Sequence, residues 1–409
     1  MTRVHPAGGT NPGRNEWVQG PGEPHEGTRS DTTSAYKRWI GDLPQTVIVQ
    51  PTSFCNLACT YCYLPDRNSR RHMSVDVATA IARSAEALTA APEGRRLDLV
   101  WHAGEPLAVG IPRMAELVAP FDQLRQQNRV QHSVQTNATL ITEDWCSFLT
   151  GHSFRVGVSI DGPDAMNAQR VDRRGRTALN RILRGISRLH EAEIPFSVIA
   201  VVTVESMREP DTLLDFLASL GCHTIGLNIE EREGVSTVRI TPGMARAAEF
   251  WRRTIAWSRR NPGVPIRDLV RLGDYLHLAR TGRLDRWAAQ PHDPLPAISS
   301  TGEVVLLSPE LAGIKDPRYG DFRAGNVLQG SLVSILSRAH RLRYVREFVK
   351  GLEACEATCE YFGFCRGAPA GNRYFEHGRL DATETDYCRA SRQALITAVS
   401  DIAREEQRA

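Results

Sequence analysis

Short apolar, β-branched segments alternate with longer amphipathic segments in the first half of the sequence, and this alternation constrains the fold more than any other feature. Parallel strands need a crossover connection, so repeated strand–helix units predict a parallel sheet covered by helices. Six units are too few for the eight of a closed (β/α)8 barrel. We therefore expect an α/β fold, a partial (β/α)6 barrel with functional groups at the carboxyl ends of its strands. The expected strands are residues 46–49, 97–102, 130–136, 155–160, 196–202 and 224–229.

The composition of the sequence changes along the chain and indicates four segments. Residues 1–45 are rich in Gly, Pro and polar residues, and we expect a disordered or extended tail. Residues 46–240 contain the barrel, and residues 241–294 have the helical periodicity of a connector. Residues 295–409 combine Gly, Cys and short segments, which predicts a small Cys-rich α+β domain that ends in a helix.

Charge and hydropathy exclude several classes of protein. The 409 residues contain 50 Lys and Arg against 47 Asp and Glu, a net charge of +3, which does not fit a strongly basic nucleic-acid-binding protein. The longest apolar run is about half of the ~18 residues that a membrane-spanning helix needs, and no secretory signal is recognisable. We expect a cytoplasmic protein with no nucleic-acid partner and no membrane partner.

Nine cysteines are distributed unevenly, and their clustering indicates metal binding. An odd number leaves one thiol outside any complete set of disulfides, and a chain without a secretory signal is expected in a reducing compartment. Clustered thiolates in such a compartment usually hold metal. Cys146 and Cys222 stand alone among apolar neighbours, and we expect buried, unreactive thiols there. The clustered residues are Cys55, Cys59 and Cys62 after the first strand, and Cys355, Cys359, Cys365 and Cys388 near the end of the chain.

The first cluster of cysteines, Cys55, Cys59 and Cys62, has the spacing Cys-x3-Cys-x2-Cys. Three thiolates on one compact loop can ligate three irons of a [4Fe–4S] cluster and leave the fourth iron open to a small chelating ligand. A structural zinc site needs four ligands, so the alternative is a zinc loop that a distant histidine completes. The number of thiolates favours the iron–sulfur interpretation.

The second cluster, Cys355, Cys359, Cys365 and Cys388, supplies a complete set of four thiolates. Four cysteines can hold a [4Fe–4S] cluster with no open iron. The same number of ligands also fits a zinc ribbon, and the spacing leaves this alternative open.

Four motifs resemble those of radical S-adenosylmethionine (SAM) enzymes. The stretch of residues 51–65, Pro-Thr-Ser-Phe-Cys-Asn-Leu-Ala-Cys-Thr-Tyr-Cys-Tyr-Leu-Pro, is similar to their cluster loop. Trp-His-Ala-Gly-Glu-Pro at residues 101–106, Gln-Thr-Asn-Ala-Thr-Leu at 135–140 and Gly-Val-Ser-Ile-Asp-Gly-Pro at 157–163 follow at successive strand ends. Their order resembles the peptide-modifying branch that carries a C-terminal SPASM-type domain. The resemblance covers about residues 46–395 and implies a radical SAM barrel.

The resemblance assigns SAM contacts to residues at the strand ends. The Gly-Glu-Pro turn with Gly104 and Glu105 would hold the amino group of SAM. Asn137 and Ser159 would contact its carboxylate and ribose.

Arg170 and Asp161 carry two further assignments. Arg170 would pair with the SAM carboxylate as a charged fork, and its alternative is an ordinary surface arginine. Asp161 is a candidate catalytic proton acceptor or polar contact, and its alternative is a turn residue before Gly162.

The C-terminal segment resembles a SPASM domain but lacks part of its cysteine set. A full domain carries about seven cysteines and two auxiliary clusters, whereas residues 297–330 contain no cysteine. Pro369 stands where a cysteine is expected four residues after Cys365. We therefore expect two [4Fe–4S] clusters in total, one that binds SAM and one auxiliary cluster.

The chain looks most like the cyclophane-forming (GrrM/AmcB-like) peptide maturases. The resemblance implies a precursor peptide as substrate and an external flavodoxin- or ferredoxin-like electron donor. A 5′-deoxyadenosyl radical would remove a β-hydrogen, and that carbon would join the ring of an aromatic residue. The alternatives are formylglycine formation in sulfatases, thioether formation, and a metal-stabilised binding protein without turnover.

Overall fold

The computed structural model describes residues 26–90, 94–236 and 242–408, and a single nine-stranded sheet organises them. The strand order is β6-β5-β4-β3-β2-β1-β7-β8-β9, and neighbouring strands from β1 to β6 are all parallel. This arrangement confirms the expected α/β fold with a partial six-stranded barrel. The strands are β1 Thr46–Val49, β2 Leu97–Trp101, β3 Val130–Thr136, β4 Arg155–Ser159, β5 Phe196–Val202, β6 Ile225–Ile229, β7 Ala297–Ile298, β8 Glu303–Val305 and β9 Gly325–Asn326.

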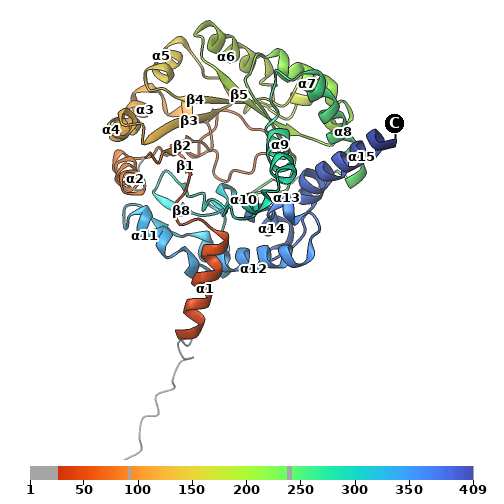
Figure 1. The fold of residues 1–409 in the computed structure, drawn as a ribbon. Coiled ribbons are helices and arrows are strands. Elements are labelled where there is room, and N and C mark those ends of the chain that lie inside the picture. Colours follow the sequence, from red (N-terminus) through yellow and green to blue (C-terminus); the bar gives the residue numbers. More distant parts are fainter. Residues whose placement is uncertain (1–25, 91–93, 237–241, 409) are drawn as a thin grey trace, which may run out of the picture.

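Helices form an arc around the outside of the curved sheet, and the strand ends and their loops lie inside it (Figure 1). Two of these helices begin at a side-chain cap, because the hydroxyl of Ser74 accepts the N–H of Val77 at 3.3 Å and that of Thr142 accepts the N–H of Trp145 at 3.2 Å. The helices of the arc are α2 Val75–Leu88, α3 Ile111–Val118, α4 Asp122–Gln126, α5 Glu143–Gly151, α6 Leu179–Glu191, α7 Pro210–Ser219 and α8 Met244–Arg260.

The C-terminal segment continues the sheet of the barrel. Strand β7 pairs in parallel with β1, with Ile48 opposite Ala297, and β8 and β9 then add antiparallel strands. Helix α15 packs against α8, and the indole N–H of Trp251 on α8 donates to the carbonyl of Ala390 at 2.9 Å. The remaining helices are α9 Arg267–Arg280, α10 Leu284–Ala288, α11 Leu332–Ser337, α12 Arg343–Thr358, α13 Phe362–Cys365, α14 Ala370–His377 and α15 Ala394–Arg408.

The N-terminal segment corrects one expectation. Helix α1, Glu26–Trp39, stands where a disordered or extended tail was expected. Trp39 and Ile40 are both only 1% exposed, and α1 packs against α12 (Figure 1). The guanidinium of Arg38 donates to both carboxylate oxygens of Glu356, at 2.7 and 2.6 Å. The buried residues Trp39 and Ile40 lie at the end of this segment, and Glu356 is more than 300 residues away from Arg38 in the sequence. Local periodicity therefore gives little indication of this helix. Residues 1–25 lie outside the described part of the chain.

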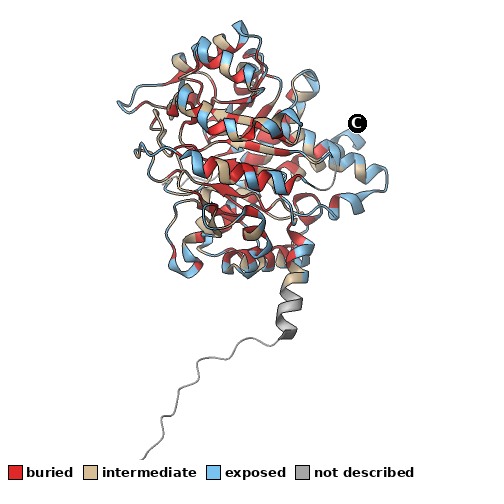
Figure 2. Ribbon diagram, turned by 90° about the vertical axis from the view of Figure 1, so that its left-hand side faces the viewer, coloured by how far each residue is buried: buried red, intermediate tan, exposed pale blue. Residues whose placement is uncertain are grey.

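Buried residues concentrate along the strands and on the helix faces that cover them (Figure 2). Within the described ranges, no helix combines the length and the apolar character that a membrane crossing requires.

Candidate active site

The three cysteines of the first motif lie on the loop after β1 and border one cavity. Cys55, Cys59 and Cys62 are partly buried and line a hollow of about 380 Å³ at the carboxyl ends of the strands. Backbone hydrogen bonds hold the loop, from Cys55 N to Arg67 O at 3.1 Å and from Ala58 N to Val171 O at 2.7 Å. Burial, followed by the nearby Glu105, raises the pKa of the Cys55 thiol to about 12. A bound metal would be needed to hold this thiol in its ionised form.

The end of β2 approaches the cysteine loop through a turn that requires glycine. Gly104 has φ +60°, and a Cβ atom there would lie 2.6 Å from the carbonyl oxygen of Phe54. The next residue, Glu105, donates its backbone N–H to that same oxygen at 2.9 Å. Gly104 lines the cavity, as the SAM assignment expects.

The side chain of Glu105 does not line this cavity. It is completely buried, and its carboxylate accepts hydrogen bonds from the Thr136 hydroxyl at 2.7 Å and from the backbone N–H groups of Asn137 and Leu107 at 2.8 and 3.0 Å. Burial raises its pKa, and these hydrogen bonds oppose the shift. Glu105 therefore joins the ends of β2 and β3, and its predicted contact with SAM stays a prediction.

Asn137 and Ser159 do line the cavity, each held by a neighbouring polar side chain. The amide nitrogen of Asn137 donates to the Asn56 side-chain oxygen at 2.9 Å, on the cysteine loop. The hydroxyl of Ser159 accepts from the amide of Gln135 at 2.9 Å. The side-chain oxygen of Asn137 already accepts the N–H and the hydroxyl of Thr139, at 3.0 and 2.6 Å, whereas the hydroxyl of Ser159 can still donate to a polar ligand.

Arg170 lines the cavity and is paired with Asp161 behind it. The guanidinium Nη2 donates to Oδ1 of Asp161 at 2.9 Å, and Nε lies 2.8 Å from Oδ2. The Tyr61 hydroxyl and the backbone N–H of Val201 donate to the same carboxylate, at 2.5 and 2.9 Å. Asp161 is 1% exposed and accepts hydrogen bonds from these three groups. The structure pairs Asp161 with Arg170, and the candidate role of Asp161 as a proton acceptor or polar contact stays a prediction.

The four C-terminal cysteines border a second, smaller hollow. Cys355 lies on α12, Cys359 follows it, Cys365 ends α13 and Cys388 begins a π-helical turn. In the described ranges, no three His, Cys, Asp or Glu side chains are placed to hold a single metal ion.

The electrostatics of this second hollow fit an anionic group held by thiolates. Arg373 is completely buried, and its Nη2 donates to the sulfur of Cys355 at 3.4 Å. In the described part of the chain no carboxylate pairs with Arg373, and its Nε has no hydrogen-bond partner. The three cysteines Cys355, Cys365 and Cys388 oppose the lowering of the Arg373 pKa by burial. Ionised thiolates around an iron–sulfur cluster would balance this buried cation.

Several residues that line the first cavity were not expected from the sequence. Glu230, Glu231 and Glu233 directly follow β6, where the rule that strand ends carry functional groups could have found them. Glu310 comes from a turn between β8 and β9, and no local signal marks it.

A partial parallel barrel with three cysteines at its open end defines the chain as an iron–sulfur enzyme of the α/β class. Residues 49–217 match the model of the radical SAM superfamily. An uncharacterised protein of Synechocystis sp., sll1766, is 34% identical over 367 residues, which cover 86% of this chain and 90% of that protein. The chain belongs to the radical SAM superfamily, whose cofactors are SAM and a [4Fe–4S] cluster.

Relatives with stated activities match only part of the chain. The serine-type anaerobic sulfatase-maturating enzyme of Klebsiella aerogenes is 31% identical over 215 residues. That alignment covers 52% of this chain and 52% of the Klebsiella enzyme, so the chain spans about half of the length of this relative.

Solved structures share the fold over most of the chain. The anSMEcpe structure with bound AdoMet and the Cp18Cys peptide has a TM-score of 0.69 at 20% identity, covering 89% of this chain and 99% of that one. SuiB of Streptococcus suis, bound to the precursor peptide SuiA, has a TM-score of 0.60 at 16% identity and covers 89% and 80%. At these identities the comparison supports the fold alone.

Proposed function

We propose that this radical SAM enzyme modifies a ribosomally made precursor peptide and forms a cyclophane, a C–C bond between a side-chain β-carbon and an aromatic ring. The observation that supports the peptide substrate is the cavity of about 380 Å³ at the open end of the barrel, which the three cysteines line together with Gly104, Asn137, Ser159 and Arg170. Similarity to proteins named for a peptide or a sulfatase substrate supports the same class.

The residues that line the cavity would bind two different cofactors. Cys55, Cys59 and Cys62 would hold the SAM-binding cluster, and Gly104, Asn137, Ser159 and Arg170 would orient SAM. When both cofactors are bound, they supply a 5′-deoxyadenosyl radical that abstracts hydrogen from an unactivated C–H bond. The buried strand ends around the cavity would exclude water from the reacting groups.

The second hollow would hold one auxiliary [4Fe–4S] cluster on Cys355, Cys359, Cys365 and Cys388. Arg373 would stabilise the ionised thiolates there. Cyclophane formation must lose one electron and one proton after the new bond forms, and this cluster is the proposed electron acceptor. The four cysteines of this segment are too few for two complete clusters, which favours cyclophane formation over a sulfatase maturase with a full cysteine set.

Formylglycine formation in a sulfatase is the second candidate function. The 31% identity to the Klebsiella enzyme favours it over thioether formation. Peptide chemistry separates the two products, since a formylglycine aldehyde reacts with hydrazides and a cyclophane does not.

The test is anaerobic reconstitution with iron, sulfide, SAM and reductant, together with a candidate precursor peptide that contains aromatic residues. We expect 5′-deoxyadenosine and a peptide that has lost two hydrogens, shows no hydrazide reactivity and keeps any thiol alkylation. A protein that binds metal but forms no 5′-deoxyadenosine would contradict an enzymatic role.

We further propose a reducing cytoplasmic location and a flavodoxin- or ferredoxin-like electron donor. All nine cysteines are free thiols in the structure, which supports such a compartment.

A further inference from the structure

One wall of the SAM-site cavity carries four glutamates and little positive charge. Glu230, Glu231 and Glu233 follow β6, and Glu310 reaches the cavity from the C-terminal segment. Among the described residues that line this cavity, the single arginine is Arg170, and Asp161 already pairs with it. Burial lowers the pKa of the other basic group, His102, to about 4, which leaves that ring neutral. The wall therefore carries more acidic groups than basic ones.

The hydrogen bonds of these carboxylates leave one of them unsatisfied. The hydroxyl of Ser308 donates to Glu310 at 2.5 Å, and the amide of Gln169 donates to Glu230 at 3.5 Å. The carboxyl groups of Glu231 and Glu233 are neighbours, and an ionised carboxyl offers only acceptor oxygens to the other. Oε2 of Glu231 is buried and has no hydrogen-bond partner. A buried carboxylate oxygen without a donor is costly, so a donor from a ligand would be stabilising.

The proximity of these carboxylates to one another also favours the binding of a cation. Burial is the largest cause that raises the pKa of Glu231 well above its usual range, and Glu310 is the next. Burial is also the largest cause that raises the pKa of Glu233 well above its usual range, and Glu231 and Glu310 add to this effect. Neighbouring buried carboxyls can remain ionised together only when a cation joins them.

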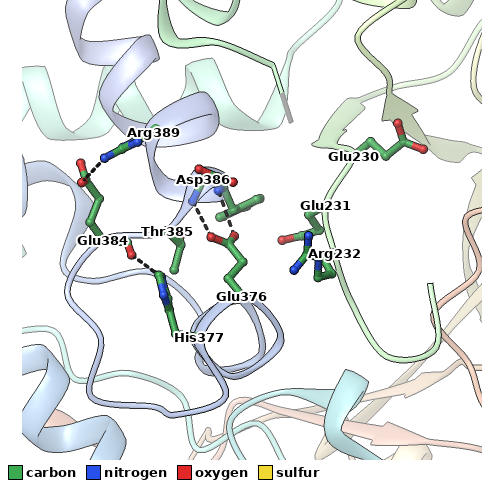
Figure 3. A pocket seen from close by; sticks show the side chains of 10 residues that line it. Glu230, Glu231, Arg232, Glu376, His377, Glu384, Thr385, Asp386 and Arg389 are labelled. Carbon is green, nitrogen blue, oxygen red and sulfur yellow. Dashed lines mark hydrogen bonds and ion pairs between the residues drawn. The ribbon is translucent and has the colours of Figure 1, made fainter. Parts of the chain in front are cut away.

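A third hollow, the outer hollow, adjoins this wall. Its volume is about 240 Å³, and it shares Glu230 and Glu231 with the SAM-site cavity. Figure 3 shows Glu231 opposite Glu376, across the space between the strand-end loop and the segment that leads to Cys388. The polar groups of the far wall are occupied, because Glu376 accepts the N–H groups of Asp386 and Tyr387 at 2.6 and 3.2 Å.

Among the described residues beside this outer hollow, no basic side chain forms an ion pair with Glu231. Glu384 forms an ion pair with Arg389 at 2.6 Å. Arg392 lies near Glu231 but faces Asp268 at 3.5 Å, and Arg232 is exposed at the rim. Among the described residues of the two hollows, Glu231 is thus the carboxylate that lies in both and keeps a buried oxygen free.

We propose that Glu231, with Glu233 and Glu310, binds a lysine or arginine side chain of the substrate peptide at the entrance to the SAM site. This inference rests on the proposed peptide substrate and defines its chemical class more closely. An ammonium or guanidinium group has only donors, so it satisfies the free oxygen of Glu231 and neutralises the glutamate wall. The peptide would enter through the outer hollow, with its cationic residue held near the residue that is modified.

The test is affinity selection from a peptide library on the anaerobically reconstituted holoenzyme with SAM. The probes are acetylated, amidated heptapeptides with one fixed central aromatic residue and all other positions varied. Mass spectrometry of the retained peptides should show lysine or arginine enriched about tenfold or more at one position, the strength expected of charge-assisted hydrogen bonds. The enrichment should fall as salt is raised.

Variants test whether the glutamate wall causes the enrichment of lysine or arginine. Glu231→Gln and Glu310→Gln should each remove most of the enrichment while the melting temperature and the iron content stay close to those of the parent protein. Glu353→Gln, an exposed residue of α12, is the matched control and should keep the enrichment. If retained peptides show no basic preference, or if the preference survives in both wall variants, the proposal is wrong.

The two proposals fail in different ways. Formation of a modified peptide and of 5′-deoxyadenosine without a basic preference would reject only the cation site. A lack of any peptide modification, with the basic preference present, would reject only the proposed reaction.

Discussion

Asp161 and Arg170 form a buried ion pair at the edge of the SAM site, with Nη2 of the arginine 2.9 Å from Oδ1 and Nε 2.8 Å from Oδ2. Because Tyr61 also donates to this carboxylate, Asp161 has no free lone pair directed into the cavity. Its role is to hold the guanidinium of Arg170 at the cavity wall, and this assignment can be tested separately from catalysis.

The first prediction concerns the stability of this pair. Asp161→Asn leaves the buried charge of Arg170 without its partner, and we expect the free energy of unfolding to fall by about 3–5 kcal/mol. Urea denaturation of anaerobically prepared protein measures it. Asp122→Asn is the control, since the pair of Asp122 with Arg125 is a partly exposed contact of 3.5 Å and is expected to contribute less than about 1 kcal/mol. An Asp161→Asn protein of normal stability that loses only product formation would support the proton-acceptor interpretation.

A second prediction follows from the glycine turn at the end of β2. Gly104→Ala places a Cβ atom 2.6 Å from a backbone oxygen of the cysteine loop, so the loop must move. We expect at least about tenfold weaker SAM binding and a loss of stability of about 1–3 kcal/mol, measured by equilibrium dialysis and by urea denaturation. Gly175→Ala has a similar φ of +74° with open space around it, and SAM binding should be unchanged there. Equal SAM affinities in the two variants would contradict this role of Gly104.

A third prediction concerns iron content. Reconstituted protein should hold about eight irons, and either Cys55→Ala with Cys59→Ala or Cys355→Ala with Cys365→Ala should leave about four. Cys146→Ala and Cys222→Ala are the controls, because both residues are buried as expected and lie outside the two cysteine hollows. Colorimetric iron and zinc assays distinguish the sites. Zinc in either site would support the alternative zinc interpretation of that cysteine set.

A fourth prediction concerns acid stability. Burial lowers the pKa of His132 to about 3, and its Nδ1 accepts the indole N–H of Trp101 at 3.0 Å. The unfolded chain binds a proton at this residue near pH 6.5 and the folded chain does not, so stability falls as the pH drops below that value. Between about pH 6.5 and 5 the contribution is about 2 kcal/mol.

The matched variant for this prediction is His132→Phe. It loses the acceptor for Trp101 and should be less stable at neutral pH by about 1–3 kcal/mol, but its stability should fall less steeply on acidification. Urea denaturation at pH 6.5 and 5 provides the comparison. Parallel losses in the two proteins would show that His132 does not carry this acid sensitivity, which would then come from other buried groups such as His292.

Local pattern was sufficient for the sheet and for the two sets of neighbouring cysteines. Strand β3, Val130–Thr136, and strand β5, Phe196–Val202, begin and end where the sequence predicts, because alternation and apolar character encode them within a few residues. Helix α3 ends at Val118 and α4 begins at Asp122, since Pro120 between them lacks the N–H that continues a helix. Cysteine spacing is equally local, and the structure gathers both predicted sets around separate hollows.

Long-range packing determined the side-chain contacts around the cavity, which the local pattern did not predict. The motif around Gly104 is recognisable in the linear sequence, but the motif alone does not show that Glu105 bonds to β3 instead of facing the cavity. The meeting of Glu310 with Glu231 depends on the C-terminal strands joining β1, some 250 residues away. Spacing and periodicity follow from the short-range geometry of the backbone, whereas the partner of a buried charge is set by which distant surfaces pack together.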